Sequence, residues 1–390
     1  MNFNYAKGGF AAVSLATLIA VGAASAPAVA QSTRDKVLSI VSESAKAGGA
    51  KEVKWGNVGG SDAEFVVEES ETVFETDGKT STLSADKVAY SGAKPSADGG
   101  FTADKITATD LELESDDGTF EVESLVVTNY VGPSPASIRA KTPGGTRFDK
   151  IVATGIKATD EKDKTIPIAS MTISTGDWVG DTPRKVGFEV KGVEVPVDAA
   201  DEGMKDVAEL GYAKLSLDAA FTGTWDDKTG RVVVDGLSIT GAEMGSLKLG
   251  LTIGGLTPEV LDAFKKAEND QAKQMELLQA LTVEKLLVRY DDASLAKRVL
   301  ATQAKKQGIP ADALVQQLSA MVPMLVSAIG NKDFEKKIST AAGAFLKAPK
   351  SLTISATPAK PTPVAEIMGA AMMAPQSLPT VLGADVRAND

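Results

Sequence analysis

The residue types that most often do chemistry in proteins are missing from this 390-residue chain, which has no histidine and no cysteine. A chain without histidine lacks the commonest general base, the commonest zinc ligand and the base of a Ser-His-Asp triad. A chain without cysteine forms no disulfide, so an oxidising compartment poses no hazard to it. We therefore predict a protein that is not an enzyme, with no catalytic residues, no metal site and no cofactor.

Three patterns remain that could bind an ion, and each has a structural interpretation that we favour. The acidic pairs Asp116-Asp117 and Asp226-Asp227 have the oxygens that calcium prefers, but they lack calcium-loop spacing and fit hairpin turns. The glycine-rich stretch 142–146 lacks the lysine and helix of a phosphate loop, so we interpret it as a turn. Asp-Lys pairs recur at 86–87, 104–105 and 149–150, and we expect solvated charges at strand starts, with adjacent residues on opposite faces.

The first thirty residues have the pattern of a cleavable signal peptide. Lys7 provides a positive charge, an apolar stretch follows over 10–21, and Ala28 and Ala30 are the small residues that a signal peptidase reads. We predict cleavage after Ala30 and a periplasmic or secreted protein. The apolar stretch 320–329 is too short to cross a membrane, so we expect no transmembrane span in the mature chain.

The formal net charge is −11, and it becomes −12 when the signal peptide is removed. An acidic protein repels phosphate backbones, so we expect no nucleic-acid partner.

Residues 31–256 alternate apolar and polar side chains in short segments between turn signals, which is typical of β-hairpins. An internal repeat runs through this region at an offset of about 45 residues. Segment 103–111 matches 148–156, and segment 119–127 matches 165–173 with one inserted residue. A degenerate copy extends over 65–88, and 232–253 resembles a later hairpin. Because one hairpin cannot bury its apolar face alone, we expect the copies to join in an extended, curved antiparallel sheet.

Residues 257–347 are predicted to form a helical insert with one returning strand at 283–290. The first helix begins at the Thr257-Pro258-Glu259 signal and is expected to run to about Ala280, and others cover 294–307, 310–329 and 331–346. Residues 348–390 add a strand at 352–355, then a proline-punctuated tail with a short helix at 364–373, which complete the same domain. The fold class is therefore α+β, mostly β, with the helical insert packed on the sheet.

The helix from 311 to 329 is the one element whose apolar face suggests binding. Its residues fall on one side at helical spacing, and Pro323 is expected to kink or divide it. This face either packs on the sheet, as amphipathic helices usually do, or covers a ligand, a membrane or a partner. The candidate binding residues are Leu314, Leu318, Met321, Val322, Leu325 and Val326.

Two stretches, 290–308 and 346–390, resemble uncharacterised secreted proteins of proteobacteria. The repeated hairpins are similar, more loosely, to β-rich envelope proteins of the AsmA-like type, although the N-terminal anchor typical of that group is missing. That resemblance implies lipid transfer along a curved, apolar-lined sheet.

Two functions follow as hypotheses. One is an envelope protein that binds or carries a lipid or another hydrophobic ligand, and the other is a structural module that binds an envelope protein partner. A hydrolase that uses paired carboxylates is a third reading, which we do not favour.

Overall fold

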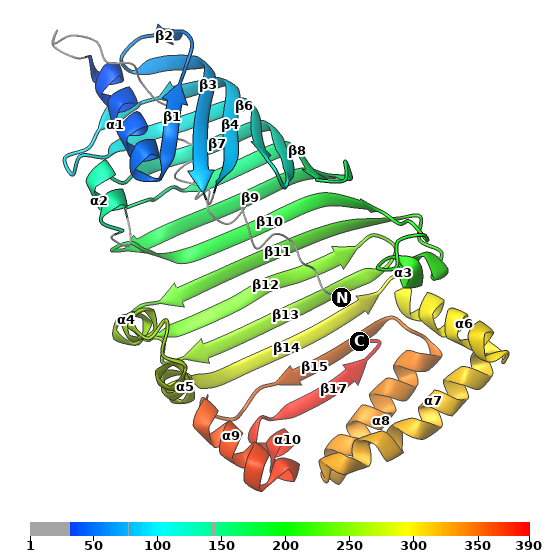
Figure 1. Cartoon of the computed structure of the whole chain (residues 1–390). Coiled ribbons are helices and arrows are strands. Elements are labelled where there is room, and N and C mark those ends of the chain that lie inside the picture. The colour runs from blue at the N-terminus through cyan, green and yellow to red at the C-terminus, as the bar shows by residue number, and fades with distance from the viewer. Residues whose placement is uncertain (1–31, 77, 142–144) are drawn as a thin grey trace. The chain divides into compact units, whose positions relative to one another are not determined.

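A computed structural model describes residues 32–76, 78–141 and 145–390, so the predicted signal peptide, Asp77 and residues 142–144 lie outside it. Seventeen strands lie within these residues, and every strand pairing is antiparallel. The chain divides into two compact units, Met1–Glu194 and Val195–Asp390, and each is described by itself. The expected class, a mostly β fold of successive hairpins with helices on the C-terminal side, is confirmed (Figure 1).

Unit 1 is a row of hairpins that follow one another in chain order. Its sheet pairs β3, β4, β6, β7, β8, β9 and β10 in succession, with three short strands, β1, β2 and β5, at its margin. In chain order its elements are α1 (Thr33–Ala47), β1 (Ala50–Lys54), β2 (Val58–Gly60), β3 (Glu64–Thr76), β4 (Lys79–Ser91), β5 (Lys94–Pro95), β6 (Phe101–Ser115), β7 (Gly118–Gly132), α2 (Pro135–Arg139), β8 (Lys150–Asp160), β9 (Thr165–Val179) and β10 (Thr182–Pro196).

One face of this sheet forms a filled core with α1. Val37, Leu38 and Val41 of the helix are buried against side chains from β3, β4 and β6, among which Phe65 stacks on Tyr90 with ring centroids 4.7 Å apart. The core continues through β7 and β8 as far as Ile156, and the equivalent positions of β9 are only half-buried. The helix was not predicted, and it supplies the cover that this end of the sheet needs.

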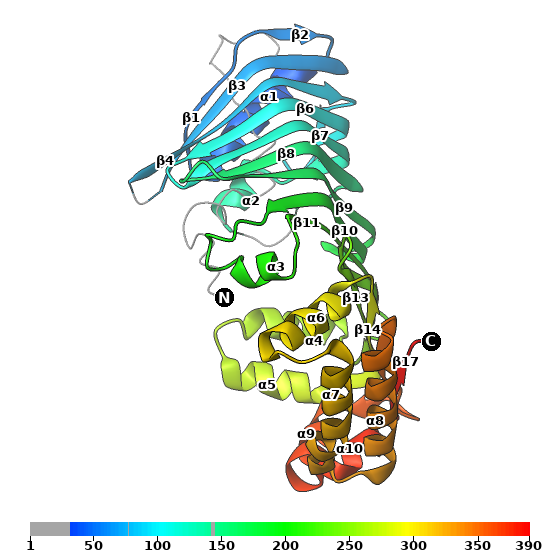
Figure 2. The ribbon, with the colours of Figure 1, turned by 90° about the vertical axis from the view of Figure 1, so that its right-hand side faces the viewer.

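The repeat predicted from the sequence is visible in the backbone. Strands β6 and β7 form one hairpin and β8 and β9 the next, and Asp110 and Gly155 occupy equivalent positions with φ of 51° and 62°. A left-handed residue inside a strand interrupts the ladder and shifts the alternation of side chains by one position. Hence Ala108 and Leu111 of β6 are both buried although they are three residues apart, and the strands of unit 1 bend along their length (Figure 2).

The Asp-Lys pairs are solvated as expected, but two of them are not at strand starts. All three pairs are exposed, and Asp86-Lys87 and Asp104-Lys105 lie inside β4 and β6. Only Asp149-Lys150 lies at the start of its strand, β8.

Gly155 provides a test of this bend. A Cβ at Gly155 would lie 2.6 Å from the Cβ of Glu123, and its φ of 62° is one that residues with a side chain rarely adopt. We expect Gly155→Ala to lower the free energy of unfolding by about 1–3 kcal/mol, measured by urea denaturation. Gly176→Ala in β9 is the matched control, because nothing lies within 4 Å of its Cβ position. Equal destabilisation by both substitutions would contradict the assigned backbone conformation.

Unit 2 is a four-strand meander, β11 to β14, extended by β15 and β17, with helices between the later strands. Its elements are α3 (Lys205–Glu209), β11 (Lys214–Asp226), β12 (Arg231–Gly241), β13 (Gly245–Gly254), α4 (Pro258–Lys266), α5 (Gln271–Ala280), β14 (Thr282–Asp292), α6 (Leu295–Gln307), α7 (Ala311–Val326), a 3₁₀ turn (Ser327–Ile329), α8 (Lys332–Lys347), β15 (Ser351–Ala356), β16 (Thr362–Pro363), α9 (Val364–Met373), a 3₁₀ turn (Pro375–Ser377), α10 (Leu378–Val381) and β17 (Ala384–Ala388).

The helix signals were mostly confirmed. Thr257 caps α4, and Gly308 ends α6 with a φ of 68°. The helix expected to reach Ala280 is divided, because Asp270 caps a new helix by accepting a hydrogen bond from the Lys273 backbone N–H at 3.0 Å. In contrast, α7 continues through Pro323 undivided. The strand β17, which the proline-punctuated tail gave no reason to expect, pairs with β15.

Candidate functional site

The strands of unit 2 have one apolar and one polar face. Paired residues of antiparallel neighbours share a face, so the register defines rows that cross the sheet. One row runs through Leu237, Leu249, Val288, Ile354 and Val386. We call the whole set the apolar face: Val232, Val234, Leu237 and Ile239 on β12; Leu247, Leu249, Leu251 and Ile253 on β13; Leu286, Val288 and Tyr290 on β14; Leu352, Ile354 and Ala356 on β15; and Ala384, Val386 and Ala388 on β17.

Much of the apolar face is open to solvent. Ile239 is 53 % exposed, Ile354 44 % and Leu286 40 %. Among the described residues, every member of the hydrophobic core cluster belongs to unit 1. A contiguous apolar surface left open marks a place where a ligand or a partner binds.

Helices border the apolar face without covering its middle. Figures 1 and 2 show α4 and α5 at one end of strands β12 to β14, α6 at the other end, and these helices on one side of the sheet. Helix α8 packs on β15 and β17, where the ring of Phe345 meets that of Tyr290 at 6.2 Å between centroids. The apolar face is therefore bordered at its two ends and partly covered by α8 at β15 and β17.

A groove of about 780 Å³ lies between α8 and β17. Its lining includes Ala341 and Ala344 from the helix, and Val386 and Ala388 from the apolar face. Its volume falls within the range of about 300–1,000 Å³ that ligand pockets occupy.

The groove lining includes three basic side chains, Lys336, Lys337 and Arg387, and two acidic ones, Asp333 and Asp390. Lys337 and Arg387 both pair with Asp385, at 2.9 and 3.1 Å, and lower the pKa of that carboxyl, the lysine having the larger effect. Lys336 is exposed and has no carboxylate within 4.0 Å among the residues that the structure describes. Lys336 can therefore attract a negatively charged group.

Tyr290 is the polar residue at the margin of the apolar face. Its hydroxyl donates a hydrogen bond to Asp292 at 2.7 Å, and burial together with this carboxylate raises the pKa of the phenol. The same carboxylate accepts a hydrogen bond from the Ala296 backbone N–H at 2.8 Å. Tyr290 thus links the sheet to the start of α6 and remains neutral at physiological pH.

Ion pairs connect the strands of unit 2 on the polar face of the sheet, opposite the apolar face. Arg289 contacts Asp291 at 2.8 Å and Asp390 at 3.0 Å, and Lys248 contacts Asp291 at 3.2 Å. The hydrogen bond from Arg289 is the main reason why the pKa of Asp291 is lowered. The stability that this shift contributes is present above the ordinary carboxyl pKa, and it is lost as pH falls through the lowered value.

The six residues predicted on the helix 311–329 separate into two groups. Leu314 is buried, and Leu318, Val322 and Val326 are half-buried where α7 packs on α6 and α8. Met321 and Leu325 are exposed. Met324 of the same helix is also exposed. Sequence reasoning did not select Met372 and Met373 of α9, which are more exposed than Met321.

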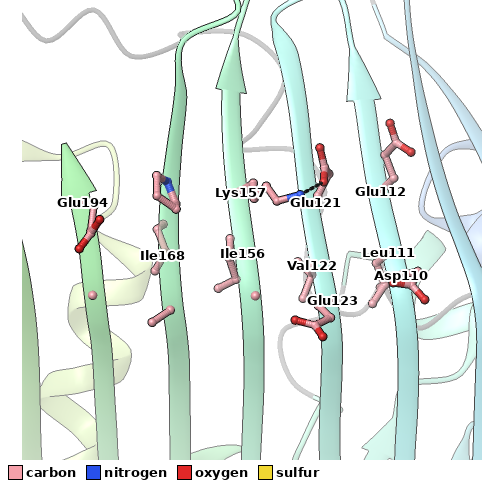
Figure 3. A pocket seen from close by; sticks show the side chains of 14 residues that line it. Asp110, Leu111, Glu112, Glu121, Val122, Glu123, Ile156, Lys157, Ile168 and Glu194 are labelled. Carbon is pink, nitrogen blue, oxygen red and sulfur yellow. Dashed lines mark hydrogen bonds and ion pairs between the residues drawn. The ribbon is translucent and has the colours of Figure 1, made fainter. Parts of the chain in front are cut away.

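In unit 1, a shallow depression of about 570 Å³ is lined by many acidic side chains, in contrast to the apolar face of unit 2 (Figure 3). It crosses five strands, and its lining includes five acidic side chains: Asp110, Glu112, Glu121, Glu123 and Glu194. Lys157 pairs with Glu121 at 2.9 Å. No group of three or more acidic side chains placed to hold a metal ion occurs in residues 32–76, 78–141 and 145–390.

The acidic turns are engaged locally. Asp117 pairs with Lys79 at 2.9 Å, and Asp226 accepts hydrogen bonds within its own turn from Thr229 and Lys228, which lower the pKa of its carboxyl. These contacts fit the hairpin-turn interpretation.

A family model described as an uncharacterized protein matches residues 238–389. The match spans the end of β12 to β17, and so includes most of the apolar face, the groove and helices α4 to α10. No curated protein matches the chain.

Proposed function

We propose that this chain is a non-enzymatic protein of the cell envelope, exported by its N-terminal signal, which holds a lipid or another hydrophobic ligand on the apolar face of unit 2. The observation that supports this proposal best is the exposure of Ile239, Ile354 and Leu286 on a face whose every row is apolar. An acyl chain on these residues removes their surface from water, at about 25 cal/mol for each Å² covered.

The groove beside α8 supports an amphiphilic ligand. An acyl chain on the apolar face can extend over Val386 and Ala388 into the groove, and a negatively charged headgroup can then pair with Lys336 beside it.

The test is native mass spectrometry, with lipid extraction, on protein purified from an exporting bacterial host. A bound lipid at a defined stoichiometry is the expected result. A ligand-free mass that persists after incubation with membranes would overturn the proposal.

Filling the groove is a further prediction. Ala344→Phe places a ring in the groove at a position that is exposed, so we expect normal folding and a ligand affinity about tenfold lower. Ala301→Phe on α6, also exposed and outside the groove lining, is the control and should bind as the unaltered protein does. Titration with a fluorescent fatty acid measures both, and equal affinities would place the ligand elsewhere.

A structural module that binds an envelope protein is the second candidate. The short strand β17 pairs with β15, and Figure 1 shows it as the outermost strand of unit 2. An edge strand can accept a strand from a partner chain. A ligand-free mass together with a stably co-purifying envelope protein would favour this candidate.

A further inference from the structure

The helices between β14 and β15 differ in charge from the rest of the protein. Residues 295–350 contain nine basic and three acidic residues, a net charge of +6 in a chain whose net charge is −11. Five lysines of this segment are exposed and have no carboxylate within 4.0 Å among the described residues: Lys297, Lys305, Lys336, Lys347 and Lys350. A concentration of free positive charge of this kind attracts an anionic surface.

The most exposed large apolar side chains of the described chain belong to α7 and α9. Met324 and Leu325 are each 66 % exposed, Met372 83 % and Met373 88 %, and Met321 is also exposed. We call these five residues the apolar tip.

A hydrogen bond joins the segment that follows α7 to the segment that follows α9. The side chain of Asn331, which begins α8 just after α7, donates to the backbone oxygen of Gln376, just after α9, at 3.0 Å. Figures 1 and 2 agree in placing α9 and α10 on the same side of unit 2 as the α7–α8 turn. The apolar tip is therefore one local feature, next to Lys332 in the α7–α8 turn, whose side chain is 84 % exposed.

We propose that the apolar tip, together with the exposed lysines of residues 295–350, docks this protein on an anionic phospholipid surface. Apolar side chains on a helix bury themselves at the boundary between headgroups and acyl chains, while basic residues nearby bind the headgroups. Each lysine close to such a surface strengthens binding about fivefold. This site is separate from the apolar face, and the proposal does not depend on the carrier function.

Helix α7 lies along the surface in this arrangement and does not cross the bilayer. The stretch Ala311–Ile329 is long and apolar enough to cross, with a mean hydropathy of 1.3. However, it includes Asp312, Gln316 and Gln317, and one side of it packs on α6 and α8 through Leu314. A helix with one side bound to protein and the other exposed suits the interface.

The experiment is flotation of the full chain with vesicles of phosphatidylethanolamine and phosphatidylglycerol, and with vesicles of phosphatidylcholine alone. We expect binding to the anionic vesicles, reduced at least about tenfold when NaCl is raised from about 50 mM to about 500 mM. The double variant M324E/L325E should bind at least about tenfold more weakly, because two carboxylates replace two inserted side chains. A199E/A200E, in an exposed loop, adds the same charge and should bind as the unaltered protein does.

Three results would overturn the proposal. One is equal binding by M324E/L325E and the unaltered protein, and another is retention on vesicles after a high-salt wash, which indicates a spanning helix. The third is the absence of binding to the anionic vesicles, and a dimer that M324E/L325E dissociates would then assign the apolar tip to a second copy of the chain. Loss of vesicle binding with retention of the co-purified lipid separates this site from the carrier site.

Discussion

Replacing both Ile239 and Ile354 by aspartate is expected to abolish lipid co-purification while leaving the protein folded. Both side chains lie on the apolar face and are about half exposed, so the substitutions remove little packing. A bound acyl chain would bury the two carboxylates without a partner, at about 3–5 kcal/mol for each. The affinity should therefore fall at least a hundredfold, by about 2.7 kcal/mol or more. Native mass spectrometry of the variant measures the loss directly.

Thr240→Asp is the matched control for this prediction. Thr240 is the neighbour of Ile239 on β12, it is also exposed, and it points to the opposite face because side chains alternate along a strand. The control should keep its lipid. If the control and the double variant lose the lipid equally, the loss reflects added charge in general, and the apolar face is not the binding surface.

Truncating Phe65 to alanine is expected to have the largest effect on stability. Phe65 is 1 % exposed and stacks on Tyr90, whose ring is in turn 6.4 Å from that of Phe101. Removing a buried ring of this kind costs about 3–5 kcal/mol of unfolding free energy. Chemical denaturation of the variant, followed by circular dichroism, measures this change.

The same substitution at Phe188 is its control. Phe188 lies on β10 in the same hairpin series and is 36 % exposed, so its truncation should cost about 1 kcal/mol or less. A similar loss at both positions would mean that the filled core of unit 1 is not where α1 and β3 to β8 place it.

The local elements could be predicted from local signals. Alternation and acidic turns predicted the hairpins, and the repeat at an offset of about 45 residues placed β6 to β9 correctly. The cap at Thr257 and the glycine at 308 predicted two helix ends, because a cap depends on a few adjacent residues. The split of the next helix at Asp270 follows from the same kind of signal, which was present in the sequence and was overlooked.

The tertiary structure decided which apolar surfaces are covered. Leu247, Leu249 and Leu251 alternate with other residues in the same way whether a helix or solvent covers that face of the strand. The alternation therefore cannot show that unit 1 has a filled core and that unit 2 has an open apolar face. Helical spacing grouped Leu314 with Leu325, but packing on α8 buries the first and leaves the second exposed. Burial depends on which segments that are distant in the sequence come into contact. The groove between β17 and α8 is an example, because no local sequence pattern predicts that these two elements lie side by side. The sequence alone determined most of the hairpin strands, their turns and the helix ends at Thr257 and Gly308, because each depends on residue types close together in the chain.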